Sequence, residues 1–208
     1  MQGETKNYYD LLIDEWNDPV LDPPPLQDYM NKWDGQIFMD KLNISKDMSV
    51  LEIGVGTGRL ALKIAPLCKW FVGIDLSPKT VERATVNLSN YGNISIICGD
   101  FLDTKFNTKF DVIYSSLTFM HIEEKQLAIE KVKQSLNDNG RFVLSIDKSQ
   151  DDIIDMGSRK IRIYPDNPKT IQQHLLKAGL TLIEIIEIEF AYIIIALKDV
   201  YKRQHNGI

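Results

Sequence analysis

From residue 48 to residue 180, short apolar runs alternate with segments of helical spacing, and this alternation constrains the fold more than any other feature. Runs such as WFVGI and FVL are apolar at successive positions rather than at every second position. Such runs are typical of strands buried on both faces, as in parallel sheets covered by helices. Strands are predicted at 48–54, 69–75, 93–100, 110–118 and 141–146, and helices at 57–67, 77–91, 123–140 and 167–179.

The last apolar stretch, TLIEIIEIEFAYIIIALK at 181–198, has enough residues for two strands and no helix between them. It is predicted to form an antiparallel hairpin that turns near residues 187–190. Its three glutamates oppose a membrane-buried segment. The chain is therefore expected to have an α/β, Rossmann-like fold with a mostly parallel sheet, an antiparallel terminal hairpin and helices on both faces.

The two ends of the chain differ from this central part. Residues 1–47 are rich in aromatic rings and have helical spacing at 8–16 and 26–43. The prolines within 18–27 predict an irregular connection, because proline removes a hydrogen-bond donor and clashes with the preceding helical turn. The predicted parts are a helical, aromatic lid segment at 1–47, an α/β domain at 48–198 and a frayed tail at 199–208.

Capping residues mark several helix ends. Ser77 and Asn167 are each followed by proline, which is the pattern of an N-cap and the first helical position. Gly140 and Gly179 are expected to end two helices by taking a left-handed conformation.

Charge and composition restrict the class of partner. The 208 residues carry a net charge of −5, whereas a nucleic-acid-binding domain usually has a basic footprint. The first residues are polar and lack the apolar core of a signal peptide, and no uncharged run reaches membrane-spanning length. We therefore expect a cytoplasmic protein with neither nucleic acid nor membrane as partner. The sequence leaves the oligomeric state open.

A glycine-rich turn, LEIGVGTGRLA, follows the first predicted strand. In a doubly wound sheet, the ligand lies beyond the carboxyl ends of the strands, where this turn falls. Gly54, Gly56 and Gly58 allow a sharp turn and a close approach to a ligand. The dinucleotide fingerprint places its third glycine at the position that Arg59 occupies here, and no Gly-Lys-Ser/Thr of a P-loop follows. The turn therefore matches neither of these two phosphate-binding motifs.

Acidic residues stand near the ends of the first three predicted strands. Glu52 precedes the glycine turn, and a carboxylate there repels a pyrophosphate but attracts an ammonium or a sulfonium. Asp75 is 21 residues beyond Gly54, where a carboxylate can accept hydrogen bonds from ribose hydroxyls. Asp100 ends the third strand. Together they predict a pocket for an adenosine that carries positive charge and no phosphate.

These segments resemble the motifs of the class I S-adenosylmethionine-dependent methyltransferases. LEIGVGTGRLA is similar to the glycine turn of that family, VGIDLSPKTVERA to its second motif, CGDFLD to its third and FDVIYSSLTFMHI to its fourth strand. LLKAGLTL resembles the junction before its terminal hairpin. The resemblance covers about residues 48–198 and implies a seven-stranded sheet in a class I methyltransferase domain.

The resemblance also implies S-adenosylmethionine as cofactor and S-adenosylhomocysteine as product. It implies that the glycine turn lines the methionine and ribose end of the cofactor, with Glu52 and the carbonyl of Ser116 near the methionine ammonium. It implies that Asp75 binds the ribose hydroxyls and that the adenine lies against the residues after the second and third strands. The implied cofactor-binding residues are Glu52, Gly54, Val55, Gly56, Gly58, Asp75, Leu76, Asp100, Phe101 and Ser116.

His121 is the candidate catalytic residue. Methyl transfer from a sulfonium needs proximity and alignment, and a general base only when the acceptor arrives protonated. His121 follows the fourth predicted strand, on the side where an acceptor is expected, and histidine titrates near neutral pH. Tyr9 and Trp33 of the lid segment are predicted to cover the pocket, because aromatic faces attract sulfonium and ammonium groups.

The acceptor is expected to be a small molecule. The fourth motif reads SSLT, so the Asp/Asn-Pro-Pro-aromatic signature of methylation on nucleic-acid bases is absent, and little insertion is present for a substrate domain. One alternative is a non-catalytic module that binds an adenosyl ligand. Another is a nicotinamide-dependent oxidoreductase, which Arg59 at the third glycine position and Glu52 oppose.

Overall fold

The computed structural model describes residues 2–155, 157 and 159–199. The predicted tail therefore lies, apart from residue 199, outside the described residues. The helices are α1 (Gln2–Asp14), α2 (Pro24–Asp34), α3 (Gln36–Leu42), α4 (Ala61–Ile64), α5 (Pro78–Asn87), α6 (Lys125–Ser135) and α7 (Pro168–Ala178), with 3-10 turns η1 (Ala65–Leu67) and η2 (Phe119–His121). The strands are β1 (Ser49–Ile53), β2 (Trp70–Asp75), β3 (Ile94–Cys98), β4 (Phe110–Ser116), β5 (Leu136–Asp147), β6 (Ile153–Asp155), β7 (Lys160–Arg162), β8 (Thr181–Glu187) and β9 (Ala191–Leu197).

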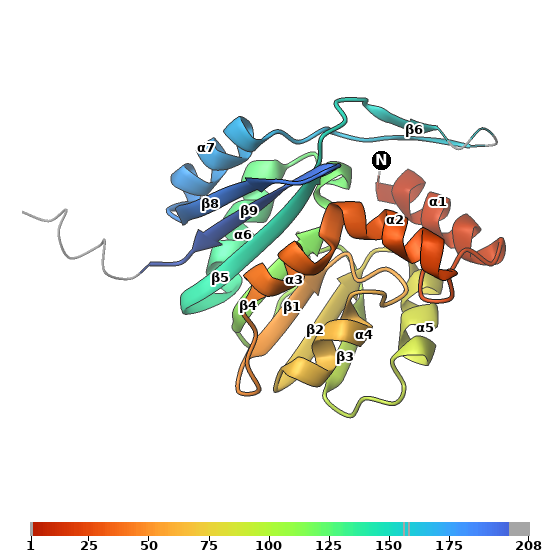
Figure 1. The fold of residues 1–208 in the computed structure, drawn as a ribbon, viewed down its shortest axis with the longest axis horizontal. Helices are drawn as coiled ribbons and strands as arrows, with labels where there is room; N and C mark the ends of the chain where they lie inside the picture. The colour runs from red at the N-terminus through yellow and green to blue at the C-terminus, as the bar shows by residue number, and fades with distance from the viewer. Residues whose placement is uncertain (1, 156, 158, 200–208) are drawn as a thin grey trace, which may run out of the picture.

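Seven of these strands form one sheet in the order β3-β2-β1-β4-β5-β9-β8 (Figure 1). β1 pairs in parallel with β2 and β4, and the parallel pairing continues to β3 and β5. β9 runs antiparallel to both β5 and β8. The prediction of a mostly parallel, Rossmann-like sheet with an antiparallel terminal hairpin is confirmed. The strand order reverses direction between β1 and β4, and the carboxyl ends of these strands define the switch point of the fold.

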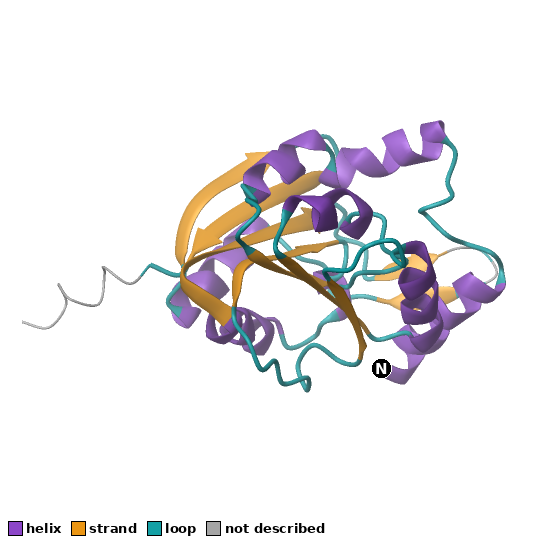
Figure 2. Cartoon of the chain, turned by 90° about the horizontal axis from the view of Figure 1, so that it is seen from below, coloured by secondary structure: helices purple, strands orange, loops and turns teal. Residues whose placement is uncertain are grey.

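Helices cover both faces of the sheet, as predicted (Figure 2). On one face, buried side chains of α3, α4 and α5 pack against β1, β2 and β4 in one apolar cluster. On the other face, α6 and α7 pack against the same sheet in a second cluster. Alternate residues of β1 enter the two clusters, with Val50 in the first and Leu51 in the second. This burial on both faces explains the continuous apolar runs in the sequence.

Several predicted helix boundaries are wrong: α1 begins at Gln2 rather than near residue 8, α4 is shorter than 57–67, and the stretch 26–43 forms two helices. α6 ends at Ser135 rather than near Gly140, because Leu136 is fully buried and pairs with Phe110 in the sheet. Gly140 lies inside β5, where a Cβ atom would lie 2.8 Å from the carbonyl oxygen of Asn137. The predicted irregular connection is too long, since α2 already begins at Pro24. Prolines are tolerated in a first helical turn, where backbone N–H groups have no intrahelical partner.

The structure adds one element that the sequence did not predict. β6 and β7 pair in a separate two-stranded ribbon between β5 and α7. Each has three residues, too few for a periodic pattern to mark them in the sequence. Within the described residues, we find no helix with both the length and the apolar character needed to span a membrane.

Candidate functional site

The glycine turn lies between β1 and α4 at the switch point. The N–H groups of Gly54 and Val55 both donate to the carbonyl of Ile74, at 2.8 and 3.0 Å, which ties the turn to β2. Gly54, Gly56 and Gly58 have φ values of +79°, +55° and +98°, which favour glycine. A Cβ atom at Gly54 would lie 1.9 Å from Oγ1 of Thr118, whereas one at Gly56 would meet no atom within 4 Å.

Gly54→Ala is expected to lower the free energy of unfolding by about 2–4 kcal/mol, because strained backbone and overpacking each cost about 1–3 kcal/mol. Gly92→Ala is the matched control, since a Cβ atom there meets nothing within 4 Å. The control should change stability by less than about 0.5 kcal/mol. Urea unfolding of the two variants measures the difference, and equal stabilities would show that Thr118 does not require glycine at position 54.

A cavity of about 540 Å³ opens beyond the carboxyl ends of β1, β2 and β4. Its size is typical of small-molecule sites, which span about 300–1,000 Å³. The structure brings most of the predicted site residues together in its wall, namely Tyr9, Glu52, Gly54, Val55, Gly56, Asp75, Leu76, Asp100, Phe101, Ser116 and His121.

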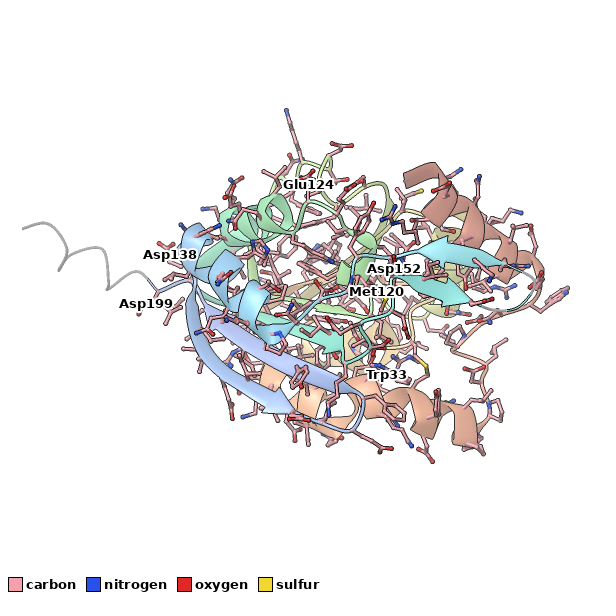
Figure 3. The ribbon with its side chains drawn as sticks, turned by 90° about the horizontal axis from the view of Figure 1, so that it is seen from above. Trp33, Met120, Glu124, Asp138, Asp152 and Asp199 are labelled. Atoms are coloured by element: carbon pink, nitrogen blue, oxygen red, sulfur yellow. The ribbon has the colours of Figure 1, made fainter. Side chains whose placement is uncertain are left out.

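Two predicted site residues lie outside the described lining of this cavity. Gly58 faces Leu88, whose Cδ1 would lie 3.0 Å from an added Cβ, so glycine at this position leaves room for Leu88. The indole N–H of Trp33 donates to Asp147 at 2.8 Å, and the ring packs on Phe190 with the centroids 4.8 Å apart. The structure therefore places Trp33 against the terminal hairpin (Figure 3), and its predicted place over the pocket is wrong.

Asp75 ends β2 and fixes the glycine turn. Its carboxylate accepts hydrogen bonds from the N–H groups of Gly56 and Ser77, both at 3.0 Å. Burial raises the pKa of Asp75, while these N–H groups act in the opposite direction. Each carboxylate oxygen can accept more than one hydrogen bond, so Asp75 can also accept from ligand hydroxyls.

Glu52 is buried, with 3 % of its surface exposed, and the hydroxyl of Tyr114 donates to its Oε2 at 2.7 Å. Glu52 and Tyr114 are directly paired on β1 and β4, which explains this contact. Burial raises the pKa of Glu52 well above its ordinary value. A cationic ligand group in the cavity would favour the ionised carboxylate, because an opposite charge offsets the loss of hydration.

His121 ends η2 and contacts the N-terminal segment. Its Nε2 lies 2.8 Å from the hydroxyl oxygen of Tyr9, and the two rings meet edge to face. Burial lowers the pKa of His121 to about 4, and the ammonium of Lys125 acts in the same direction. Burial raises the pKa of Tyr9. Both side chains are therefore neutral at neutral pH.

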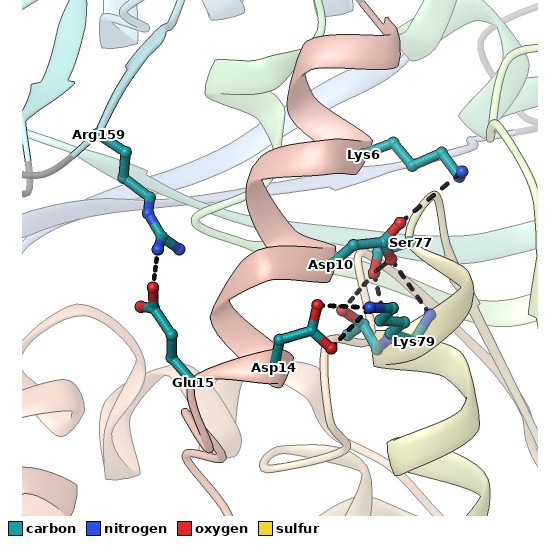
Figure 4. Close-up of polar contacts among 8 residues, drawn as sticks. Lys6, Asp10, Asp14, Glu15, Ser77, Lys79 and Arg159 are labelled. Carbon is teal, nitrogen blue, oxygen red and sulfur yellow. Dashed lines mark hydrogen bonds and ion pairs between the residues drawn. The ribbon is translucent and has the colours of Figure 1, made fainter.

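α1 forms part of the roof of the cavity. Asp10 accepts from the hydroxyl of Ser77 at 2.7 Å, and Asp14 accepts from the ammonium of Lys79 at 2.6 Å, at the beginning of α5 (Figure 4). On the other side, Glu15 forms an ion pair with Arg159, beside the β6–β7 ribbon.

The β6–β7 ribbon forms another part of the roof. Ile161 and Arg162 of β7 line the cavity. The segment after β7 is held by backbone bonds, from Ile163 to the carbonyl of Asp152 at 2.8 Å and from Tyr164 to the carbonyl of Met120 at 2.7 Å (Figure 3). The ribbon is thereby tied to η2, which carries His121.

Sequence reasoning missed several charged residues of the cavity wall, and two of them, Asp34 and Arg59, form a buried pair. Asp34 at the end of α2 is fully buried, and its Oδ2 accepts from Nη2 of Arg59 at 2.5 Å and from the hydroxyl of Ser116 at 2.6 Å. In the sequence, Arg59 stands out only as a departure from the dinucleotide fingerprint. No spacing rule links position 34 to the glycine turn, so the sequence held no signal for Asp34.

Fold and site together define a Rossmann-like protein with a nucleoside-sized cavity whose polar wall is mainly acidic. A family model described as a methyltransferase domain matches residues 44–184, more than half of the chain. The chain therefore belongs to the class I S-adenosylmethionine-dependent methyltransferases. The cofactor of this family is S-adenosylmethionine, and the open cradle at Gly56 and the buried Glu52 fit a cationic adenosyl ligand.

Individual relatives agree with this membership. The chain is 34 % identical over 108 residues to an uncharacterized methyltransferase of Staphylococcus carnosus, covering 51 % of this chain and 50 % of the relative. It is 34 % identical over 105 residues to a ribosomal protein L11 methyltransferase of Clostridium perfringens, covering 49 % of this chain and 32 % of the relative. The matched part thus spans half or less of these curated relatives.

A solved structure shows the same fold. The N-methyltransferase NodS of Bradyrhizobium japonicum, crystallised with S-adenosyl-L-homocysteine, superposes with a TM-score of 0.65 at 20 % identity. The match covers 86 % of this chain and 94 % of NodS. Family membership thus favours the adenosyl cofactor over the nicotinamide alternative.

Proposed function

We propose that this chain transfers a methyl group from S-adenosylmethionine to a small-molecule acceptor that binds in the cavity beneath α1. The observation that supports a small-molecule acceptor is the cover of the cavity, since Tyr9 of α1 and Ile161 of β7 both line it. A cavity covered by two elements of the same chain suits a compact acceptor better than a folded macromolecule. The lid role proposed for residues 1–47 thus rests on α1.

In this proposal, different parts of the cofactor bind at the carboxyl ends of different strands. Asp75 accepts from the ribose hydroxyls, and Asp100, Leu76 and Phe101 surround the adenine. The glycine turn, Glu52 and the carbonyl of Ser116 lie at the methionine end. The bound cofactor supplies a methyl group already activated by its sulfonium, so the chain has to align the acceptor and, for an acceptor that arrives protonated, remove a proton.

His121 is the group that removes the proton. In the tautomer whose Nε2 carries the proton and donates to the hydroxyl oxygen of Tyr9, Nδ1 is an acceptor, and Nδ1 has no hydrogen-bond partner among the described residues. A neutral imidazole with a pKa of about 4 is a weak base. It accepts a proton as the acidity of the acceptor atom rises during methylation. Tyr9 fixes the ring orientation of His121.

The test is a small-molecule acceptor screen with the purified chain and S-adenosylmethionine, with formation of S-adenosylhomocysteine as the readout. The proposal expects acceptor-dependent product with at least one class of amine, hydroxyl or thiol compound. Methylation of proteins in a cell extract, with no small molecule accepted, would overturn the acceptor class. S-adenosylhomocysteine binding without any methyl transfer would favour the binding-module alternative. The cytoplasm as compartment stays a prediction.

A further inference from the structure

A buried ion pair stands in the cavity wall beside the glycine turn. It joins Asp34, the last residue of α2, to Arg59, which follows the turn. Asp34 is fully buried and the side chain of Arg59 is 15 % exposed. Both line the cavity with Glu52 and Ser116, so four polar side chains from α2, β1, the turn and β4 converge at one end.

Each partner of this pair keeps one polar atom that the protein does not satisfy. Oδ2 of Asp34 holds Arg59 and Ser116, but Oδ1 is buried and has no hydrogen-bond partner among the described residues. Nη1 of Arg59 is likewise buried without such a partner. Buried polar atoms are nearly always paired in folded proteins, and an unpaired atom at a ligand cavity suggests that a ligand completes the pairing. The unsatisfied atoms are an anionic acceptor and a cationic donor.

The position of the pair defines which part of a ligand it would meet. Asp75 and Asp100 lie at the ends of β2 and β3, on the side of the cavity assigned above to ribose and adenine. Asp34, Arg59 and Ser116 lie towards β4, on the other side of the glycine turn. A ligand that reaches from Asp75 across the turn would present its non-nucleoside end to this pair.

We propose that Asp34 and Arg59 form a clamp for the α-amino-carboxylate end of the cofactor. Oδ1 of Asp34 accepts from the α-ammonium, and Nη1 of Arg59 donates to the α-carboxylate, while the internal ion pair holds both side chains in place. Charge-assisted bonds of this kind are among the strong ones in proteins. The inference rests on the proposed function, and it makes α2 part of the cofactor site.

The test compares two ligands that differ only at the amino-acid end. S-adenosylhomocysteine carries it, and 5′-methylthioadenosine has the same nucleoside and thioether without it. Arg59→Lys and Asp34→Asn should each weaken S-adenosylhomocysteine binding at least tenfold by calorimetry, while 5′-methylthioadenosine binding changes less than twofold. S-adenosylhomocysteine, but not 5′-methylthioadenosine, should also slow amide hydrogen exchange in α2.

Arg83→Lys is the matched control, because Arg83 also pairs with a buried aspartate, Asp18, but does not line the cavity. It should leave the affinity for both ligands within twofold of the wild type. If Asp34→Asn fails to fold, the test uses Arg59→Lys and the wild type, and compares their binding of S-adenosylhomocysteine and of decarboxylated S-adenosylhomocysteine. The loss caused by Arg59→Lys should vanish for that ligand, which lacks the carboxylate.

Two outcomes would overturn the clamp: equal weakening of both ligands, which is the result for a purely structural ion pair, or unchanged binding of S-adenosylhomocysteine. The proposed function itself would be overturned if the wild-type chain bound neither S-adenosylhomocysteine nor 5′-methylthioadenosine.

Discussion

Asp75→Ala is expected to weaken S-adenosylhomocysteine binding by at least tenfold, which corresponds to about 1.4 kcal/mol. The carboxylate is proposed to accept from both ribose hydroxyls, and hydrogen bonds to a charged group are each worth about 1.5–3 kcal/mol. The variant also removes the acceptor for the N–H of Gly56, which fixes the glycine turn. Isothermal titration calorimetry with S-adenosylhomocysteine measures the change.

The control is Asp103→Ala, an exposed carboxylate beyond β3 that does not line the cavity. This variant should bind S-adenosylhomocysteine with wild-type affinity and have the same thermal midpoint. An Asp75→Ala variant that binds as tightly as the control would remove Asp75 from the cofactor site. Circular dichroism of both variants separates lost binding from lost folding.

His121→Ala is expected to lower kcat by about 10²-fold or more while the affinity for S-adenosylhomocysteine changes little, since a positioned general base contributes about 10²–10⁴-fold. The expectation applies to an acceptor that arrives protonated. His174→Ala is the control, because His174 lies on α7, bonds to Gln126 and does not line the cavity. Full activity of His121→Ala with such an acceptor would show that His121 is not the general base.

The pH profile gives a second readout for His121. Its pKa of about 4 lies below the ordinary value of 6.5, so the imidazole stays neutral and able to accept a proton from pH 8 down to about pH 5. The kcat of the wild type should therefore show no inflection near pH 6.5 and should fall as pH drops towards 4, where protonation removes the base. A wild-type inflection near 6.5 that is absent in His121→Ala would contradict the burial of this side chain.

The order of helices and strands could be predicted because burial constrains the residue types within each short segment. Strands covered on both faces must be apolar at successive positions, so β2 and β9 stand out in the sequence. Caps are equally local: Ser77 and Asn167 accept from the N–H three residues later, and Gly179 has a φ of +74°, as predicted. The error at Gly140 shows the limit, because only the pairing of Leu136 with Phe110 ends α6 early.

Part of the cavity lining could be predicted from local sequence patterns as well. The predicted residues that do line it stand at strand ends or in the glycine turn, and parallel strands bring all such positions to one edge of the sheet. Trp33 was misplaced because aromatic content does not say which neighbour a ring will have. Its partners, Asp147 and Phe190, lie more than a hundred residues away in the chain.

The sequence alone determined the parallel sheet, the glycine turn and the acidic strand ends, because each depends on residues close together in the chain. Only the tertiary structure decided what surrounds them. It brought Tyr9 to His121 across 112 positions and Asp34 to Arg59 across 25, and it placed the β6–β7 ribbon beside α1. Such contacts follow from how helices pack on the finished sheet, and no local pattern encodes that packing.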